Sequence, residues 1–338
     1  MNNRPVAPRQ RKVLPWLTVL NLTFLVLLWL LETFVAERHP LTALLLYLPQ
    51  HGAVLPAGIL CLWALARREW RILACNSAAL ACCAVVFLGF NVPRHSGKTR
   101  GTTGHRTALR VMTYNVHYGA AGTAHIAKVL DALRPDIICL QETRPYNRWP
   151  DPVPRLQRHL RGWHMARGAE VTTFSRYPFV FQRSHPMPAK IGRVVLETRV
   201  RVKGQELTVF NVHLSTTGAT VKRPRHYVVA SDLLGGSAAI RREQVDVLLP
   251  LAHAAPAPVL IMGDFNNPPR GRLYRRLTRH FQDAFRAAGW GLGYTFRADL
   301  PVLRIDYVFA SPQVGIQRCF APSVRASDHR PVVAELVL

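Results

Sequence analysis

Hydrophobic residues are distributed unevenly along the 338-residue chain, and the unevenness divides it into two parts. The first ninety residues form an almost continuous apolar block, whereas short apolar runs alternate with polar clusters from residue 108 onward. The uncharged runs 14–31 and 72–90 approach the roughly 20 apolar residues that cross a bilayer. A third uncharged run, 41–66, is interrupted by two prolines and a glycine. The pattern predicts a membrane region followed by a globular domain.

The membrane region is expected to contain about three transmembrane helices within 13–92. A basic tail at 1–12 precedes it, and a polar linker at 93–107 follows it. A cleavable signal peptide is the alternative for the first run, but three successive apolar segments favour an anchor. Basic residues on the two sides of these segments nearly balance. Because the first helix usually dominates and large domains cross regardless of charge, we expect a multi-pass cell-membrane protein with an extracytoplasmic domain.

The second part of the chain, 108–338, has the periodicity of a layered α/β domain. Ile126, Val129, Leu130 and Leu133 share one face of a helix that Pro135 would stop. Strands are expected at 108–119, 136–143, 171–179, 194–202, 206–215, 257–266, 303–311 and 331–338, and helices at 125–135, 242–252 and 272–285. Because strands outnumber the helices that fall between them, a sheet-rich sandwich is predicted.

Polar residues recur where these strands end. The set is Asn115, Glu142, His213, Asp264, Asn266, Asp306, Asp328 and His329. One such residue would be explained as a turn former, but strand ends that all carry carboxylate, carboxamide or imidazole groups predict a shared pocket. Side chains two apart in an extended strand point the same way. We therefore expect the side chains of Asp264 and Asn266 to contact the same bound water or phosphate.

The carboxylates of this set define its expected chemistry. Four of them would repel one another if they converged without a cation. Magnesium prefers oxygen ligands and keeps several waters, and the six cysteines show no zinc-binding spacing. Two histidines beside such an ion suit phosphoryl chemistry, because they can donate or accept protons and stabilise negative charge on phosphate oxygens.

The net charge of the chain is +25, with 44 Lys and Arg against 19 Asp and Glu. Such a balance suits anionic partners, whether nucleic acid, phospholipid headgroups or small phosphates. Most of the excess is arginine, and a biased base composition of the genome also leads to many arginines. The positive charge alone therefore does not indicate nucleic acid as the partner. No run of aromatic residues for base stacking stands out either. Binding of nucleic acid would therefore depend on phosphate contacts.

Six motifs carry a family resemblance. In order they are TYNVHYG, CLQET, FNVHLS, MGDFNNPP, RIDYVFAS and SDHRPV. Together they resemble the motif series of the endonuclease/exonuclease/phosphatase superfamily, in its deoxyribonuclease and neutral sphingomyelinase branches. Each motif alone is weak, but six in this order are specific, and they cover 108–338. The apolar block indicates a membrane-anchored member of bacterial type.

The resemblance implies a four-layered α/β sandwich, with two packed, mainly antiparallel sheets flanked by helices. It also implies a magnesium-dependent attack of water on a phosphate ester, with manganese as a substitute ion. Glu142 matches the principal metal ligand of the family. Asn115 would lie beside it and contact metal or phosphate, and Asp328 would be a second metal-binding or water-orienting carboxylate.

Further roles follow from the same resemblance. Asp264 matches the residue that orients or deprotonates the attacking water, and Asn266 would fix that geometry. His329 would bind the scissile phosphate while Asp306 holds it in orientation. His213 would stabilise phosphate or protonate the leaving group.

Substrate contacts are expected from Asn211 and from Arg223 and Arg225 in the long basic loop 216–244. The expected partners are a phosphate-ester substrate, either nucleic acid or a phospholipid headgroup, and membrane lipids. No obligate protein partner is evident. The leading hypothesis is a membrane-anchored phosphodiesterase. A sphingomyelin or phospholipid phosphodiesterase, a phosphoinositide phosphatase and a non-catalytic membrane-tethered binding module are the alternatives.

Overall fold

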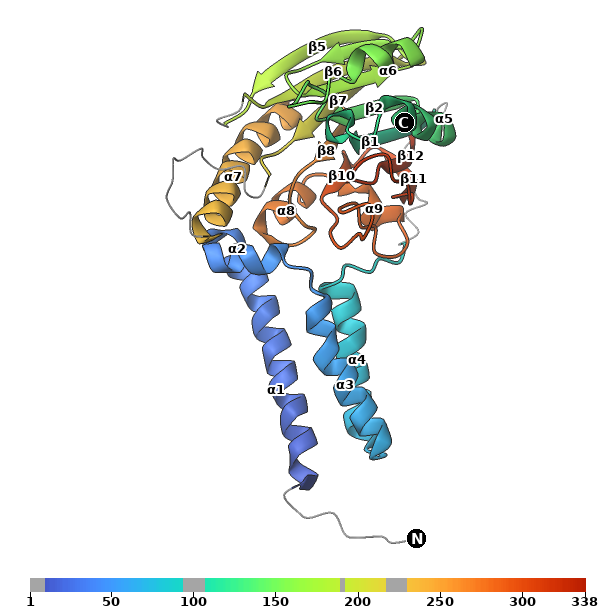
Figure 1. Ribbon diagram of the computed structural model, residues 1–338. Coiled ribbons are helices and arrows are strands. Elements are labelled where there is room, and N and C mark those ends of the chain that lie inside the picture. The colour runs from blue at the N-terminus through green and yellow to red at the C-terminus, as the bar shows by residue number, and fades with distance from the viewer. Residues whose placement is uncertain (1–9, 94–106, 189–191, 217–229) are drawn as a thin grey trace.

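The computed structural model describes residues 10–93, 107–188, 192–216 and 230–338. Helices near the N-terminus form a stalk, and the remainder forms a larger α/β body at one end of that stalk (Figure 1). The stalk and its connections to the body comprise α1 (Gln10–Leu30), η1 (Leu31–Val35), η2 (Ala36–Arg38), α2 (Pro40–Tyr47), α3 (His51–Ala66) and α4 (Trp70–Val86).

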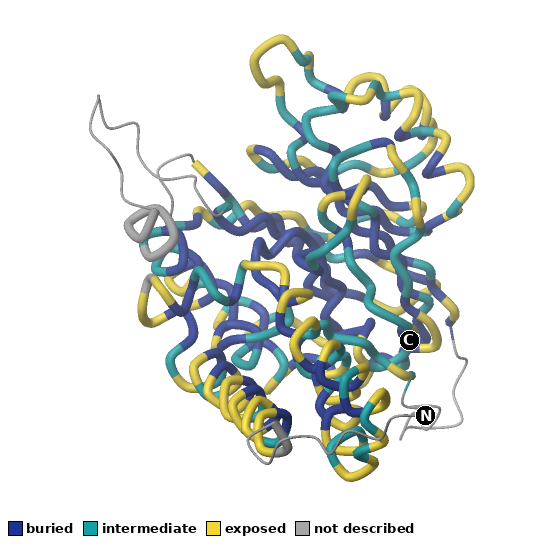
Figure 2. The backbone as a smooth tube through the Cα atoms, turned by 60° about the horizontal axis from the view of Figure 1, so that its bottom comes forward, coloured by how far each residue is buried: buried dark blue, intermediate teal, exposed yellow. Residues whose placement is uncertain are grey.

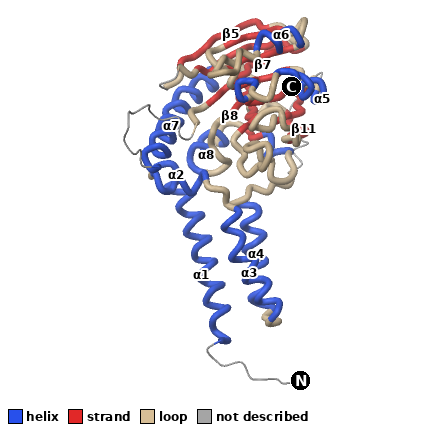
Figure 3. Tube along the Cα trace, viewed as in Figure 1, coloured by secondary structure: helices blue, strands red, loops and turns tan. Residues whose placement is uncertain are grey.

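The body is built on two six-stranded sheets (Figure 3). The first has the order β11-β12-β1-β2-β4-β3, with β1 (Ala108–Asn115), β2 (Ile137–Gln141), β3 (His164–Arg167), β4 (Val171–Ser175), β11 (Gly315–Phe320) and β12 (Val332–Val337). The second has the order β5-β6-β7-β8-β10-β9, with β5 (Phe179–Pro186), β6 (Val194–Val202), β7 (Gln205–His213), β8 (Val259–Asp264), β9 (Gln282–Asp283) and β10 (Asp306–Ala310). The described pairings are antiparallel except for one parallel pair at the centre of each sheet, β1 with β2 and β7 with β8.

Helices cover the outer faces of both sheets. They are α5 (Thr123–Leu133), α6 (Val153–His159), α7 (Ala230–Ala254) and α8 (Gly271–Thr278). The shorter η3 (His117–Gly119) follows β1, and α9 (Ala284–Ala288) packs into the core between the sheets. A central core lies between the sheets, where Val111 and Cys139 belong to the same cluster as Val209 and Met262. Separate apolar clusters join α5 and α6 to the first sheet and α7 and α8 to the second. The predicted four-layered sandwich is therefore confirmed.

One predicted helix, 272–285, is wrong in extent. It ends at Thr278, and a new short helix begins after Asp283. The Asp283 carboxylate accepts hydrogen bonds from the backbone N–H groups of Phe285 and Arg286, at 3.0 and 3.3 Å, which is the bonding of an N-cap. The same carboxylate pairs with buried Arg304 at 2.8 Å. A capping residue that pairs with Arg304, just before β10 (Asp306–Ala310), thus begins a separate helix within a pattern that looks continuous in the sequence.

The stalk supports part of the membrane prediction. Among the described residues, one helical segment, Lys12–Arg38, is long and apolar enough to cross a membrane, a property shared by signal sequences. The pair Leu41–Tyr47 and His51–Ala66 would make a second span, but it bends by 73°. The helix Trp70–Val86 is apolar but shorter. Large apolar side chains are exposed along α1 and α3, as the yellow stretches in Figure 2 illustrate.

The stalk and the body contact each other through charged and polar groups. Glu37 accepts hydrogen bonds from the backbone N–H groups of Arg272 and Leu273, where α8 begins. The guanidinium of Arg270 donates to the carbonyl oxygens of Leu46 and Phe87, at the ends of α2 and α4. Its Nε also lies 3.5 Å from Glu32. The loop that follows β8 is therefore joined directly to the stalk.

This junction gives a first prediction. Arg270→Ala should lower the free energy of unfolding by about 3 kcal/mol, because it leaves buried Glu32 without its positively charged partner. Thermal unfolding of the purified full chain in detergent measures the effect. The control is Arg276→Ala, whose partner Asp246 is 59% exposed, so that its loss should cost no more than about 1 kcal/mol. Equal unfolding temperatures for the two variants would show that the junction does not stabilise the protein.

Candidate active site

The candidate site lies where the carboxyl ends of the two central parallel pairs face each other. β1 ends at Asn115, β7 at His213 and β8 at Asp264, and Glu142 follows β2. Parallel neighbours end at the same edge of a sheet, which is where open α/β sheets build their sites. The Nδ2 group of Asn115 donates to Glu142 Oε1 in its own sheet and to Asp264 Oδ2 in the other, both at 3.1 Å. The two sheets thus meet in one polar cluster.

Asp264 is the centre of this cluster. Its side chain is buried, and its Oδ2 atom accepts hydrogen bonds from the amide groups of Asn115 and Asn266, each at 3.1 Å. The Nε2 atoms of two histidines approach the same oxygen, His213 at 3.6 Å and His329 at 3.7 Å. A buried carboxylate needs such partners, because it has lost its hydration.

Asn266 reaches Asp264 by a different geometry from the one predicted. β8 ends at Asp264, and Asn266 has a φ of 48°, so the segment is a turn and the extended i, i+2 arrangement is wrong. The backbone N–H of Asn266 donates to Asp264 Oδ1 at 2.8 Å, and its side chain also donates to the carbonyl oxygen of Leu214. Gly263 is required just before this turn, because a Cβ there would lie 1.8 Å from the Val212 carbonyl oxygen.

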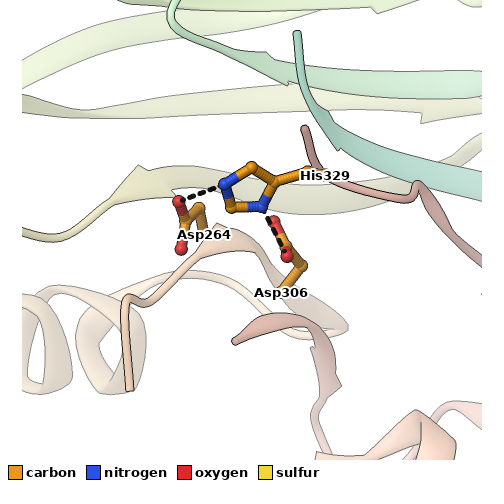
Figure 4. A group of neighbouring side chains, drawn as sticks. All are labelled: Asp264, Asp306 and His329. Atoms are coloured by element: carbon orange, nitrogen blue, oxygen red, sulfur yellow. Dashed lines mark hydrogen bonds and ion pairs between the residues drawn. The ribbon is translucent and has the colours of Figure 1, made fainter. Parts of the chain in front are cut away.

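His329 is held between two carboxylates (Figure 4). Its Nδ1 lies 2.9 Å from Asp306 Oδ2, and its ring packs against Phe296 with centroids 4.8 Å apart. Burial alone would lower the pKa of His329, but the charges of Asp306 and then Asp264 raise it to about 10. The imidazole is therefore positively charged at neutral pH. It presents Nε2 to the centre of the site, where it can bind an anionic oxygen.

His213 is oriented by residues that the sequence analysis did not identify. Its Nδ1 lies 3.2 Å from Glu170 Oε1, and Arg193 lies 2.8 Å from the same oxygen. Burial opposes ionisation of Glu170, but His213, Arg193 and Arg144 lower its pKa to about 2. Glu170 is therefore ionised and directs Nε2 of His213 toward Asp264.

Glu170 escaped prediction because it precedes a strand. The polar residues of the predicted pocket lie where strands end, but β4 runs antiparallel to β2, with Val171 opposite Gln141. The start of β4 therefore lies at the same edge as the end of β2. The signal was a single acidic residue at the start of a predicted strand, 171–179, which only the pairing of the strands makes meaningful.

The remaining predicted residues lie in different places. Asp328 lies at the rim, with 40% of its side chain exposed and its Oδ1 3.5 Å from His117 Nδ1. Asn211 is fully buried, and its amide nitrogen donates to the carbonyl oxygens of Leu140 and Thr172 in the other sheet. Asn211 thus joins the two sheets and does not face the cluster, so the substrate contact predicted for it does not fit this position. Arg223 and Arg225 lie outside the described residues.

The donors of the cluster suit a hard divalent cation. Carboxylate oxygens of Asp264 and Asp306 lie within 4.8 Å of each other, beside the imidazole of His329. Burial, and after it the charge of Asp306, raises the pKa of Asp264, and a cation would oppose that shift. Asp306 Oδ1 is buried and has no hydrogen-bond partner. Glu142 and the side-chain oxygen of Asn115 add further oxygen atoms beside this group. Oxygen-rich sets of this kind favour Mg²⁺ or Mn²⁺ over Zn²⁺.

The comparison with protein families identifies the class. The model of the endonuclease/exonuclease/phosphatase family matches residues 112–329, which include all the site residues described above. The chain therefore belongs to this family, whose members are phosphoesterase hydrolases and generally use divalent metal ions. The resemblance deduced from the six motifs is confirmed. A comparison with curated proteins found no significant match.

Solved structures share the fold at low sequence identity. An endonuclease/exonuclease/phosphatase family protein from Bacteroides thetaiotaomicron is 18% identical, with a TM-score of 0.56 over 70% of this chain and 99% of that one. TDP2 from D. rerio, complexed with a single-strand DNA product, is 19% identical, with a TM-score of 0.53 over 68% and 99%. The mannosyl-6-phosphatase Bt3783 from B. thetaiotaomicron is 18% identical, with a TM-score of 0.53 over 68% and 100%.

The Glu170–His213 pair gives a second prediction. Glu170→Gln should lower kcat by about 10- to 100-fold with little change in KM, because the ring of His213 loses the charge that orients it. Hydrolysis of bis(p-nitrophenyl) phosphate by the full chain measures both parameters. Glu197→Gln is the matched control, since Glu197 makes a similar contact with His185 at 2.8 Å away from the site. Equal losses in the two variants would contradict a specific role for Glu170.

Proposed function

We propose that this protein is a membrane-anchored, magnesium-dependent phosphodiesterase that hydrolyses its substrate by attack of water on phosphorus. The observation that carries the proposal is the convergence of two buried histidines on one oxygen of a buried carboxylate, Asp264. Family membership supports phosphate-ester hydrolysis. Structures of similar fold include a DNA-processing protein and a sugar phosphatase, so they do not select a substrate.

Each residue has a chemical role in this proposal. Asp264, fixed by Asn266, orients the attacking water and accepts its proton, for which a raised pKa is suited. His329, kept positively charged by Asp306, binds a nonbridging oxygen of the phosphate and stabilises the charge that develops there. His213, oriented by Glu170, is placed on the other side of Asp264 Oδ2 to interact with the phosphate or the leaving group.

The metal would be held by Glu142 with Asn115 and the neighbouring carboxylates. When bound, it would supply positive charge to the phosphate oxygens and lower the pKa of its bound water. The residues of the chain would contribute the rest, because their hydrogen bonds already place donors and acceptors around Asp264. Asp328 at the rim, beside His117, would orient a water or a second ion.

Metal removal gives a third prediction. Treatment of the full chain with EDTA should reduce hydrolysis of bis(p-nitrophenyl) phosphate by at least about 100-fold, because the charge on the phosphate is no longer neutralised. Addition of Mg²⁺ or Mn²⁺ should restore it. Activity that survives chelation, or that returns with Zn²⁺ alone, would contradict a hard-cation site.

Replacement of a histidine tests the same proposal. His329→Gln should lower kcat by about 10²- to 10³-fold, as loss of a donor to a developing oxyanion does. The control is His159→Gln, because His159 pairs with exposed Asp131 on the surface. A His329→Gln protein with the wild-type kcat and a wild-type unfolding temperature would rule out the assigned role.

The membrane anchor is part of the proposal. We infer that the stalk crosses the membrane three times and places the catalytic body outside the cytoplasm, supported by the apolar segment Lys12–Arg38 and the apolar helices α3 and α4. The phosphate ester would then come from the extracytoplasmic side, as nucleic acid or as a lipid headgroup.

Fractionation of cells gives a fifth prediction. The protein should stay in the membrane after an alkaline wash and keep its full mass of 38.0 kDa, because the first apolar segment is retained. Added protease should degrade the body in intact cells. A soluble product shortened by the first helix would identify a signal sequence, and protection until lysis would place the body in the cytoplasm.

A further inference from the structure

Three aromatic rings stack beside the site, although no aromatic run is visible in the sequence. The centroids of Tyr118 and Tyr146 are 4.5 Å apart with an interplanar angle of 20°. Trp149 lies 6.3 Å from both, at angles of 8° to Tyr118 and 27° to Tyr146. We propose that these rings form a stacking subsite for a nucleobase that flanks the scissile phosphate. The proposal rests on the proposed phosphodiesterase function and names its substrate class.

The backbone holds these rings in a fixed arrangement. Tyr146 and Trp149 exchange two backbone hydrogen bonds, at 3.0 and 2.9 Å, which close a tight turn around Asn147. Asn147 has a φ of 49°, and Tyr118 has a φ of 53°. Left-handed non-glycine residues are uncommon, and they cluster at binding and catalytic sites, where the surrounding structure maintains them. Two constrained segments therefore hold the rings in place before a ligand binds. Binding of a ligand then needs little further ordering of the protein.

The same two loops carry residues of the site. Tyr118 follows Asn115 by three positions, and Tyr146 follows Glu142 by four. His117 connects the stack with the rim, because its ring lies 5.1 Å from Trp149 and its Nδ1 lies 3.5 Å from Asp328. A base that stacks on these rings would therefore lie at the rim of the site, on the side of Asp328.

The stack is open to solvent and bordered by arginines. Tyr146 is 42% exposed, so part of its surface is available to a ligand. The guanidinium of Arg148 lies 5.8 Å from the centroid of Trp149, and Arg144 lies near Glu170 on the same side of the site. Aromatic rings combined with arginines are the usual means of binding single-stranded nucleic acid without reading its sequence.

The same features disfavour a choline headgroup. A quaternary ammonium is normally enclosed by several aromatic faces, whereas Tyr118, Tyr146 and Trp149 lie nearly parallel to one another and form no enclosure. Arg148 over Trp149 would repel a second cation. A planar, uncharged base would stack on the rings, and the phosphates attached to it would pair with the arginines. Among the substrates considered, nucleic acid fits this surface better than a phospholipid.

Binding without turnover tests the subsite first. Fluorescence anisotropy should show that the full chain, in detergent with EDTA, binds a labelled thymidine decamer about 5-fold or more tightly than a decamer of base-free sugars. Tyr146→Ala should remove the difference, and Tyr146→Phe, which keeps the ring, should retain it. The control is Trp290→Ala, since Trp290 is also an exposed aromatic residue, at 67%, but lies against Phe90 at the stalk. Equal binding of the two decamers by the wild type would overturn the proposal.

Hydrolysis separates this inference from the proposed function. With Mg²⁺, the ratio of kcat/KM for the thymidine oligomer to that for the base-free oligomer should fall about tenfold in Tyr146→Ala. An unchanged ratio, or a wild type that prefers a choline phosphodiester to both oligomers, would overturn the subsite and leave the phosphodiesterase intact. Failure to hydrolyse any of these esters would instead contradict the phosphodiesterase itself, and the binding measurement would still decide whether the rings bind a base.

Discussion

Burial of the Asp264 carboxylate is the constraint on which the site depends. A charged group that has lost its hydration is stable only where donors and positive charge replace water. Asn115 supplies an amide from the first sheet, Asn266 supplies one from the turn after β8, and His329 adds its charge. These groups come from both sheets, so the arrangement exists only when the sheets pack in this register. Packing of the sheets thus maintains the Asp264 carboxylate in this position. Its burial, and after it the charge of Asp306, raises its pKa.

The turn that holds Asn266 also connects the site with the N-terminal helices. Asn267 accepts a hydrogen bond from the Tyr47 hydroxyl at 3.1 Å, and Arg270 donates to carbonyl oxygens at the ends of α2 and α4. One short loop therefore has strand β8 on one side and the stalk on the other. Because the stalk fixes the position of this loop, experiments on substrate and mechanism should use the full chain.

Much of the fold could be predicted from local patterns, because the inner strands of both sheets are short apolar runs that end in polar residues. The edge strands β3, β5, β9 and β11 are short or carry exposed residues, and that pattern does not predict them. Residues that depend on the pairing of distant segments could not be predicted either. Glu170 joins the site because β4 is antiparallel to β2, and Asp283, which pairs with distant Arg304, begins a separate short helix within a pattern that predicts one continuous helix. Tyr118 and Tyr146 are 28 positions apart and become one stack only through the parallel pairing of β1 and β2. Asn266 was predicted beside Asp264 for the wrong geometric reason, since a turn replaces the extended strand.

The Asp264→Asn variant tests the central claim most directly, because it removes one charge and keeps the shape of the side chain. Hydrolysis of bis(p-nitrophenyl) phosphate by the full chain with Mg²⁺ should fall by at least about 10³-fold, as expected when a general base is lost. The variant should remain folded, with a cooperative thermal transition. A folded Asp264→Asn protein that hydrolyses the ester at the wild-type rate would contradict the assignment of Asp264 as the centre of the active site.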